Sequence, residues 1–124
     1  MKSFSIFLFA LLLNFSAFGQ DDKVYLMGDW EGTLSAQGKE YKVIFHINYD
    51  GKTLSATLDS PDQNVFGFKV DEISYSEDVL KMKINQVQGD YEGTVKEKKL
   101  EGKWTQGGAT FDLNLEKTKK RGSS

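Results

Sequence analysis

Apolar and polar residues alternate along most of the chain, and a helical period is nearly absent. The segment KEYKVIFHINYD, residues 39 to 50, places an apolar or aromatic side chain at every second position from Tyr41 to Tyr49. Successive side chains of an extended strand point to opposite faces, so these residues share one face. The opposite face is polar except for Ile44. This pattern predicts a half-buried strand, and Asp50-Gly51 after it predicts a two-residue hairpin turn.

The same alternation returns between short turn segments over the rest of the chain. It predicts about eight strands, over residues 28–34, 41–49, 54–58, 68–75, 80–84, 91–95, 100–104 and 111–115. Phe68 and Val70 occupy even positions and would share one face of a strand, whereas Ile73 and Tyr75 occupy odd positions and would point to the other face. This shift indicates a β-bulge near Asp71-Glu72. The predicted fold is therefore all-β, an antiparallel meander that forms a small barrel or a strongly curved half-barrel.

One seven-residue phrase occurs twice, as GDWEGTL at residues 28–34 and GDYEGTV at residues 89–95. On a strand, Trp30 and Tyr91 each share a face with the glycine two residues later. A glycine at such a position lets a sheet curve and leaves room for a neighbouring ring. Glu31 and Glu92 then face solvent, so we do not interpret them as a catalytic pair.

The first residues are typical of a secretory signal peptide rather than of the folded domain. Lys2 precedes an apolar run over residues 4–13, which is far shorter than the ~20 residues of a membrane span. Small residues, Ala17 and Gly19, then occupy the positions expected before a cleavage site. We predict a signal peptide over residues 1–19, one domain over 20–116 and a basic, flexible tail over 117–124. The exported protein would be periplasmic or extracellular.

Charge and cysteine content exclude several classes of function. The net charge is −2, although Lys117, Lys119, Lys120 and Arg121 are gathered at the C-terminus, so the body of the chain is more acidic still. An acidic body argues against nucleic-acid binding, which needs a basic face. The chain has no cysteine, which rules out disulfides, a thiolate nucleophile and a cysteine-based zinc site.

Two resemblances rest on short motifs. A Gly-x-Trp that opens the first strand of a small secreted meander, Gly28 to Trp30, resembles the calycin group of lipocalins and avidins. The ordered set GDWEGTL, VIFHI, LSATLDSPDQ, YEGTV and LEGKWTQGGATFDLNL resembles the small β-rich domain at the N-terminus of many secreted bacterial α/β-hydrolases. This second resemblance implies an accessory domain. The G-x-S-x-G nucleophile motif of the hydrolase domain does not occur in the chain, so we predict that the protein is not an enzyme.

Inward aromatic side chains are the main candidates for binding. A small barrel either fills its interior with side chains or holds one small ligand. We predict that the ligand-binding residues, if the interior is hollow, are Trp30, Tyr41, Phe45, Tyr91, Trp104 and Phe111. The pocket should lie at the open end beside the longest connection, residues 59–67, where Asp59, Asp62 and Asn64 supply polar groups. A filled core is the alternative interpretation.

The remaining chemistry of the sequence is sparse. His46 is the single histidine and falls on the polar face of its strand, which predicts a surface residue rather than a catalytic one. Asp59, Asp62 and Asn64 lack the spacing of a calcium loop, so we predict no metal and no cofactor. The leading hypothesis is a secreted β-barrel that binds a small apolar or amphipathic ligand. The alternative is a protein-interaction or inhibitory module that acts with a separate secreted hydrolase, with an exposed apolar patch that includes Ile44.

Overall fold

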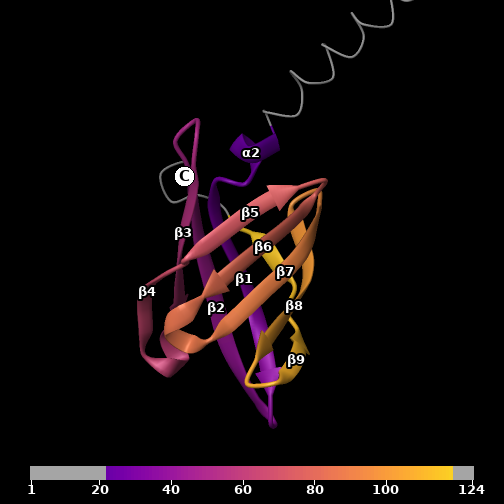
Figure 1. The fold of residues 1–124 in the computed structure, drawn as a ribbon. Coiled ribbons are helices and arrows are strands. Elements are labelled where there is room, and N and C mark those ends of the chain that lie inside the picture. The colour runs from indigo at the N-terminus through magenta and orange to yellow at the C-terminus, as the bar shows by residue number, and fades with distance from the viewer. Residues whose placement is uncertain (1–21, 119–124) are drawn as a thin grey trace, which may run out of the picture.

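The computed structural model describes residues 22–118, which form one antiparallel sheet of ten strands that curls strongly into a half-barrel (Figure 1). This confirms the predicted all-β meander. The predicted signal peptide, residues 1–19, and most of the predicted tail, from Lys119 onward, lie outside the described residues. The strands are β1 (Gly28–Ala36), β2 (Lys39–Tyr49), β3 (Leu54–Ser60), β4 (Val65–Lys69), β5 (Glu72–Ser76), β6 (Val79–Ile84), β7 (Gly89–Lys96), β8 (Lys99–Gln106), β9 (Ala109–Asp112) and β10 (Leu115–Lys117).

Three short helical segments accompany the sheet. A four-residue helix, α2 (Asp22–Tyr25), precedes β1. Two 3₁₀ helices, η1 (Pro61–Gln63) and η2 (Asn85–Val87), connect β3 to β4 and β6 to β7. Each ends at a residue in the left-handed conformation, Asn64 after η1 and Gln88 after η2.

Strand order follows the chain except near its end. The neighbours are β4-β3-β2-β1-β10-β8-β7-β6-β5, and β9 also pairs with β8. The last strand, β10, lies between β1 and β8 and so joins the beginning of the sheet to its second half. It includes Lys117, which the sequence placed at the start of the tail.

Two of the eight predicted strands are each divided in the structure. The segment 68–75 changes partner at Val70 and Asp71, where the amide of Val70 donates to Ala56 of β3 and that of Asp71 to Lys83 of β6. The shift in alternation that predicted a β-bulge is therefore a change of strand partner. The two edge strands, β4 and β5, are consecutive in the chain, and Val70 and Asp71 connect them. The segment 111–115 is likewise interrupted between β9 and β10.

The concave side of the sheet holds the hydrophobic core. Trp30 is 0% exposed and Trp104 is 5% exposed, so both indoles lie on the inner side, as the alternation predicted. Buried apolar side chains from both halves of the sheet surround them, among them Phe45, Leu80 and Leu115. These residues form one contiguous cluster, which is the expected source of most of the stability.

The repeated glycines provide space for close neighbours. A Cβ at Gly93 would lie 2.6 Å from the hydroxyl oxygen of Tyr91, and a Cβ at Gly89 would lie 2.2 Å from the ring of Trp104. These glycines therefore make room for aromatic rings, as predicted. Gly32 differs, because its Cβ would lie 2.2 Å from the backbone oxygen of Asn114. There the missing side chain lets the chain entering β10 approach β1.

The two ends of the half-barrel differ. At one end lies α2, and at the other lie the β1–β2 and β8–β9 hairpins (Figure 1). Leu26, just after α2, is fully buried, and its carbonyl oxygen accepts a hydrogen bond from the Trp30 indole at 2.9 Å. The Lys117 ammonium lies 4.6 Å from the centre of the Tyr25 ring and 5.7 Å from that of Trp30. Within residues 22–118, no helix has the length and apolar character needed to cross a membrane.

Candidate functional site

A pocket of about 300 Å³ opens at the end of the half-barrel opposite α2. We call this site the mouth pocket. Its walls come from the β1–β2 hairpin, from β3 with η1 and the start of β4, from η2 and from β8 with β9. Its apolar surface is supplied mainly by Leu34, Tyr41, Val43, Leu58, Trp104 and Phe111. Ligand sites in proteins are typically concave and mostly apolar with a few fixed polar groups, and this volume is at the small end of their range.

The six aromatic residues predicted for binding divide into two groups. Tyr41, Trp104 and Phe111 line the mouth pocket. Trp30, Phe45 and Tyr91 are fully buried in the core instead, and none of them is among the described residues of the pocket wall.

The second group has structural roles. The rings of Phe45 and Tyr91 lie 5.8 Å apart between centroids, and the Tyr91 hydroxyl donates to the Leu113 carbonyl at 3.0 Å. Burial raises the pKa of Tyr91, so its hydroxyl stays neutral at physiological pH. The interior is thus filled near α2 and in the middle, and hollow at the mouth.

Two polar side chains that the sequence interpretation missed, Ser60 and Gln63, line the pocket. Ser60 is only 3% exposed, and its hydroxyl oxygen accepts a hydrogen bond from the Gln63 amide at 2.9 Å. A serine hydroxyl that accepts one bond keeps its own proton to donate. They belong to the same connection, residues 59–67, as the predicted Asp59, Asp62 and Asn64.

A second polar anchor is Gln106, at the end of β8. Its side-chain oxygen accepts from the Trp104 indole at 3.0 Å, and its nitrogen donates to the Val87 carbonyl at 2.7 Å. Gln106 therefore holds the indole edge and η2 together on one side of the pocket. Such bonds fix a wall in place before any ligand arrives.

The predicted loop residues Asp59, Asp62 and Asn64 are not among the described residues that line the mouth pocket. Asp62 accepts the backbone N–H of Lys42 at 2.8 Å and so ties η1 to β2. Asn64 has a φ of 60° and ends η1, a position that favours asparagine. These side chains shape the connection rather than the pocket.

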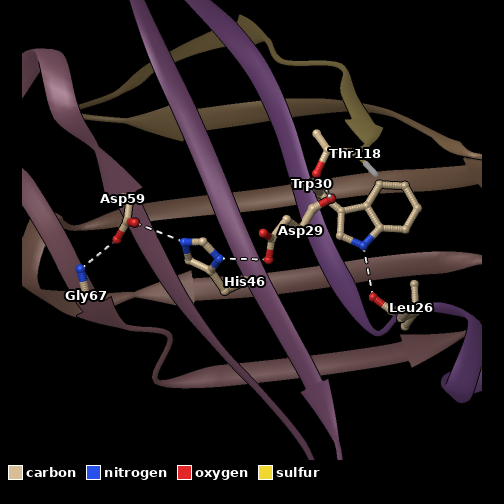
Figure 2. Close-up of polar contacts among 7 residues, drawn as sticks. All are labelled: Leu26, Asp29, Trp30, His46, Asp59, Gly67 and Thr118. Carbon is tan, nitrogen blue, oxygen red and sulfur yellow. Dashed lines mark hydrogen bonds and ion pairs between the residues drawn. The ribbon is translucent and has the colours of Figure 1, made fainter. Parts of the chain in front are cut away.

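Asp59 instead belongs to a cluster on the polar face of β1, β2 and β3 (Figure 2). The Nδ1 of His46 bonds to a carboxylate oxygen of Asp29 at 2.8 Å, and its Nε2 to one of Asp59 at 2.9 Å. The other oxygen of Asp59 accepts the backbone N–H of Gly67 at 2.7 Å. We call these three side chains the histidine clasp, because they join β1, β2 and β3 and reach β4.

The clasp perturbs the ionisation of its members. Partial burial alone would lower the pKa of His46, but hydrogen bonds to Asp59 and Asp29 and their charges outweigh it and raise the pKa above 6.5. For Asp59, burial acts to raise the pKa, yet the Gly67 amide and His46 lower it overall. Because a carboxylate accepts hydrogen bonds, the arrangement suits a doubly protonated imidazolium.

This geometry differs from that of a catalytic triad. In a triad, one nitrogen of the histidine faces a nucleophile and the other a carboxylate. Both nitrogens of His46 face carboxylates. Within residues 22–118, no group of three or more His, Cys, Asp or Glu side chains is arranged to hold a metal ion.

A larger hollow of about 820 Å³ lies against β5, β6, β7 and β8. Its wall includes exposed charged residues such as Lys83 and Asp90, which form an ion pair at 3.1 Å. These side chains are about half exposed, as expected of a solvated outer face of a sheet. The smaller mouth pocket is the better candidate because its wall combines aromatic surface with the buried Ser60 hydroxyl and with the side-chain amides of Gln63 and Gln106, which are held by hydrogen bonds.

Comparison of the chain with protein-family models, with curated proteins and with solved structures found no match in any of the three. The candidate function is therefore argued from the site alone.

Proposed function

We propose that the protein is a secreted, non-catalytic β-barrel module that binds a small apolar or amphipathic ligand in the mouth pocket. The observation that carries the proposal is the coincidence of three aromatic side chains, Tyr41, Trp104 and Phe111, with a buried hydroxyl at Ser60 in one pocket. Aromatic surface supplies apolar contact area, and a few fixed polar groups orient a ligand.

The size of the pocket limits the ligand. A volume of about 300 Å³ corresponds to about ten water molecules, since one occupies about 30 Å³ in the liquid. The ligand, or the part of it that enters, is therefore a medium-length aliphatic chain or one to two rings. Its polar end would meet the Ser60 hydroxyl or the Gln63 amide.

The alternative, a docking or inhibitory module that acts with a separate secreted hydrolase, would be favoured by an exposed apolar patch that includes Ile44. Ile44 is half-buried on β2. The exposed large apolar side chains of the described chain lie on or beside α2 and on β4 instead: Val24, Tyr25, Met27 and Phe66. No observation at Ile44 favours the alternative, and ligand binding remains the better-supported proposal.

The two tryptophans allow a direct test by NMR. The Trp104 indole N–H bonds to Gln106 in the pocket wall, whereas that of Trp30 bonds to Leu26 near α2. The protein is titrated with 1-octanol, 1-naphthol, octanoate and a neutral disaccharide. We expect at least one of these compounds to shift the Trp104 indole signal and to leave that of Trp30 in place. Equal movement of both signals, or no response to any of the four compounds, would contradict the proposal.

Matched variants localise the effect. Ala36 is half-buried in the pocket wall, and Ala36→Phe should fill the pocket and weaken binding at least about tenfold. Thr110 is exposed on β9, lies outside the described wall and points to the opposite face from its neighbour Phe111, so Thr110→Phe adds a ring without filling the pocket. Binding that is lost equally in both variants would place the ligand elsewhere.

A further inference from the structure

We infer that the mouth pocket selects uncharged ligands, and that Gln63 is a residue that sets this preference. The inference rests on the proposed binding function and specifies its ligand class. The pocket should bind a neutral alcohol more tightly than the carboxylate or the ammonium compound with the same carbon skeleton.

The composition of the pocket wall carries the inference. Charged residues make up 27% of the chain. None of the described residues that line the mouth pocket is Asp, Glu, Lys, Arg or His. Its polar side chains are three amides and two hydroxyls: Gln37, Gln63, Gln106, Ser60 and Tyr41. Each of three larger hollows contains charged side chains: those against β5–β8 and beside β1 and β10 have both signs, and one of about 380 Å³ beside β1 and β9 includes Asp112.

Nearby carboxylates are held away from the pocket by bonds of their own. Asp59 bonds to His46 and to Gly67, and Asp62 bonds to the Lys42 amide. They add negative charge around the mouth without offering a cation to pair with an entering carboxylate. A charged group buried without a partner loses its hydration and gains little in exchange.

A neutral hydroxyl suits the same wall. The Ser60–Gln63 pair offers a hydroxyl proton that can be donated, and the amide of Gln63 has both a donor and an acceptor end. A ligand hydroxyl, which is donor and acceptor at once, can bond to such groups without bringing a charge into the pocket. The ligand class is therefore an uncharged alcohol, phenol or amide with an apolar body.

Three compounds with the same eight-carbon chain test the preference: 1-octanol, octanoate and octylammonium, titrated near neutral pH by calorimetry and by the Trp104 indole signal. We expect 1-octanol to bind at least about tenfold more tightly than either ion. Comparable affinity of either ion overturns the inference and leaves the binding function intact. Failure of all three overturns it as well, and the naphthol and disaccharide titrations then decide whether the binding function stands.

A substitution tests the role of Gln63 directly. Gln63→Lys places an ammonium at the wall of the pocket and should reverse the preference between octanoate and 1-octanol. Gln86 is exposed on η2 and outside the described wall, so Gln86→Lys adds the same charge near the mouth as a control. An unchanged preference in a folded Gln63→Lys protein, or an equal change in Gln86→Lys, rejects the assignment of Gln63.

Discussion

At the scale of single residues, the least expected feature is the position of His46 between Asp29 and Asp59 (Figure 2). A neutral imidazole has one N–H, so it can donate to only one carboxylate, and the second contact becomes repulsive. The clasp is therefore complete only when His46 is protonated and both carboxylates are ionised.

The direction of the pH dependence follows from the pKa shifts. The pKa of His46 is raised, so its contribution to stability is fully present below the ordinary value of 6.5 and is lost as pH rises through the pKa of the folded state. The pKa of Asp59 is lowered, so its contribution is present above the ordinary value of 3.8 and is lost as pH falls. Between these values the clasp has its full strength.

We predict that proton NMR titration of His46 gives a midpoint above 6.5, and that Asp59→Asn moves the midpoint downward. The signal is unambiguous because the chain has one histidine. Since the His46 side chain is 36% exposed, we expect His46→Gln to lower the free energy of unfolding by no more than about 1 kcal/mol at about pH 5.5, and by less at about pH 8.5. A midpoint at or below 6.5 in the wild type would show that burial outweighs the two carboxylates.

Sequence alone could place His46 on the polar face but could not find the clasp. Asp29 lies 17 positions before His46 and Asp59 lies 13 after it. Only the strand register brings them together, with Asp29 directly opposite His46 on β1 and Asp59 two residues beyond its partner Thr57 on β3. Register is a tertiary property, because it depends on turn lengths and on which faces are buried.

At the scale of elements, glycines on the inner face of the sheet decide how closely strands and rings approach. Gly93 of β7 and Gly102 of β8 are directly opposite each other. A Cβ at Gly102 would lie 2.5 Å from both the Glu92 backbone oxygen and the Tyr91 hydroxyl. The backbone atom cannot move aside as a flexible side chain can, so this position excludes any larger residue.

We predict that Gly102→Ala lowers the free energy of unfolding by about 3 kcal/mol or more, measured by urea denaturation, because the added methyl group overpacks a closed space. Gly108→Ala is the control. No atom lies within 4 Å of its built Cβ, and its φ of +81° leaves backbone strain of about 1 kcal/mol as the main cost. Equal destabilisation by the two substitutions would show that the approach of β7 to β8 is not the limiting constraint.

The alternation of apolar residues predicted most elements because one face of the sheet is buried. β2 shows this best, since Val43, Phe45 and Ile47 are buried as the pattern required. The division of segment 68–75 was missed because the alternation shows a break but not a change of partner. The division of segment 111–115 was missed because the alternation of Phe111, Leu113 and Leu115 continues through it. The Asp50-Gly51 turn is longer than predicted. The connection covers residues 50–53, and the Asp50 carboxylate accepts the amides of Lys52 and Thr53. Local side-chain bonds of this kind compete with the shortest turn.

The same reasoning explains what was predictable in the mouth pocket. The length of the connection over residues 59–67 led us to expect a pocket beside it, and Ser60, Gln63 and Val65 of the pocket wall belong to this connection. The residues that enter the pocket, Ser60 and Gln63, could not be chosen over Asp59 and Asp62 without the geometry of η1. An aromatic ring fills the core or lines the pocket according to how far along the barrel axis its residue lies. The alternation along a strand shows which face a residue is on, but not this position.

At the scale of the whole molecule, the half-barrel has one end closed for stability and one end open. The closed end consists of Leu26 and the Trp30 indole with Lys117 beside it. Burial lowers the pKa of Lys117, and the nearby Lys98 adds to the effect. Its ammonium also donates to the Tyr25 carbonyl at 2.5 Å, so the last strand holds α2 in place. The open end carries the mouth pocket.

This division predicts that the two ends respond independently to substitution. Leu26 is 0% exposed, so Leu26→Ala should lower the free energy of unfolding by about 3 kcal/mol through lost burial and an unfilled cavity. Residues that share no contact usually contribute additively, so the affinity for a ligand in the mouth pocket should change less than about twofold in the folded variant. The measurements are urea denaturation and the Trp104 indole titration. Gln63→Lys is the opposite case: we expect it to change the ligand preference and to change the free energy of unfolding by no more than about 0.5 kcal/mol. A large loss of affinity in Leu26→Ala, at a temperature where it remains folded, would mean that the shared core transmits the disturbance and that the closed end is part of the binding site.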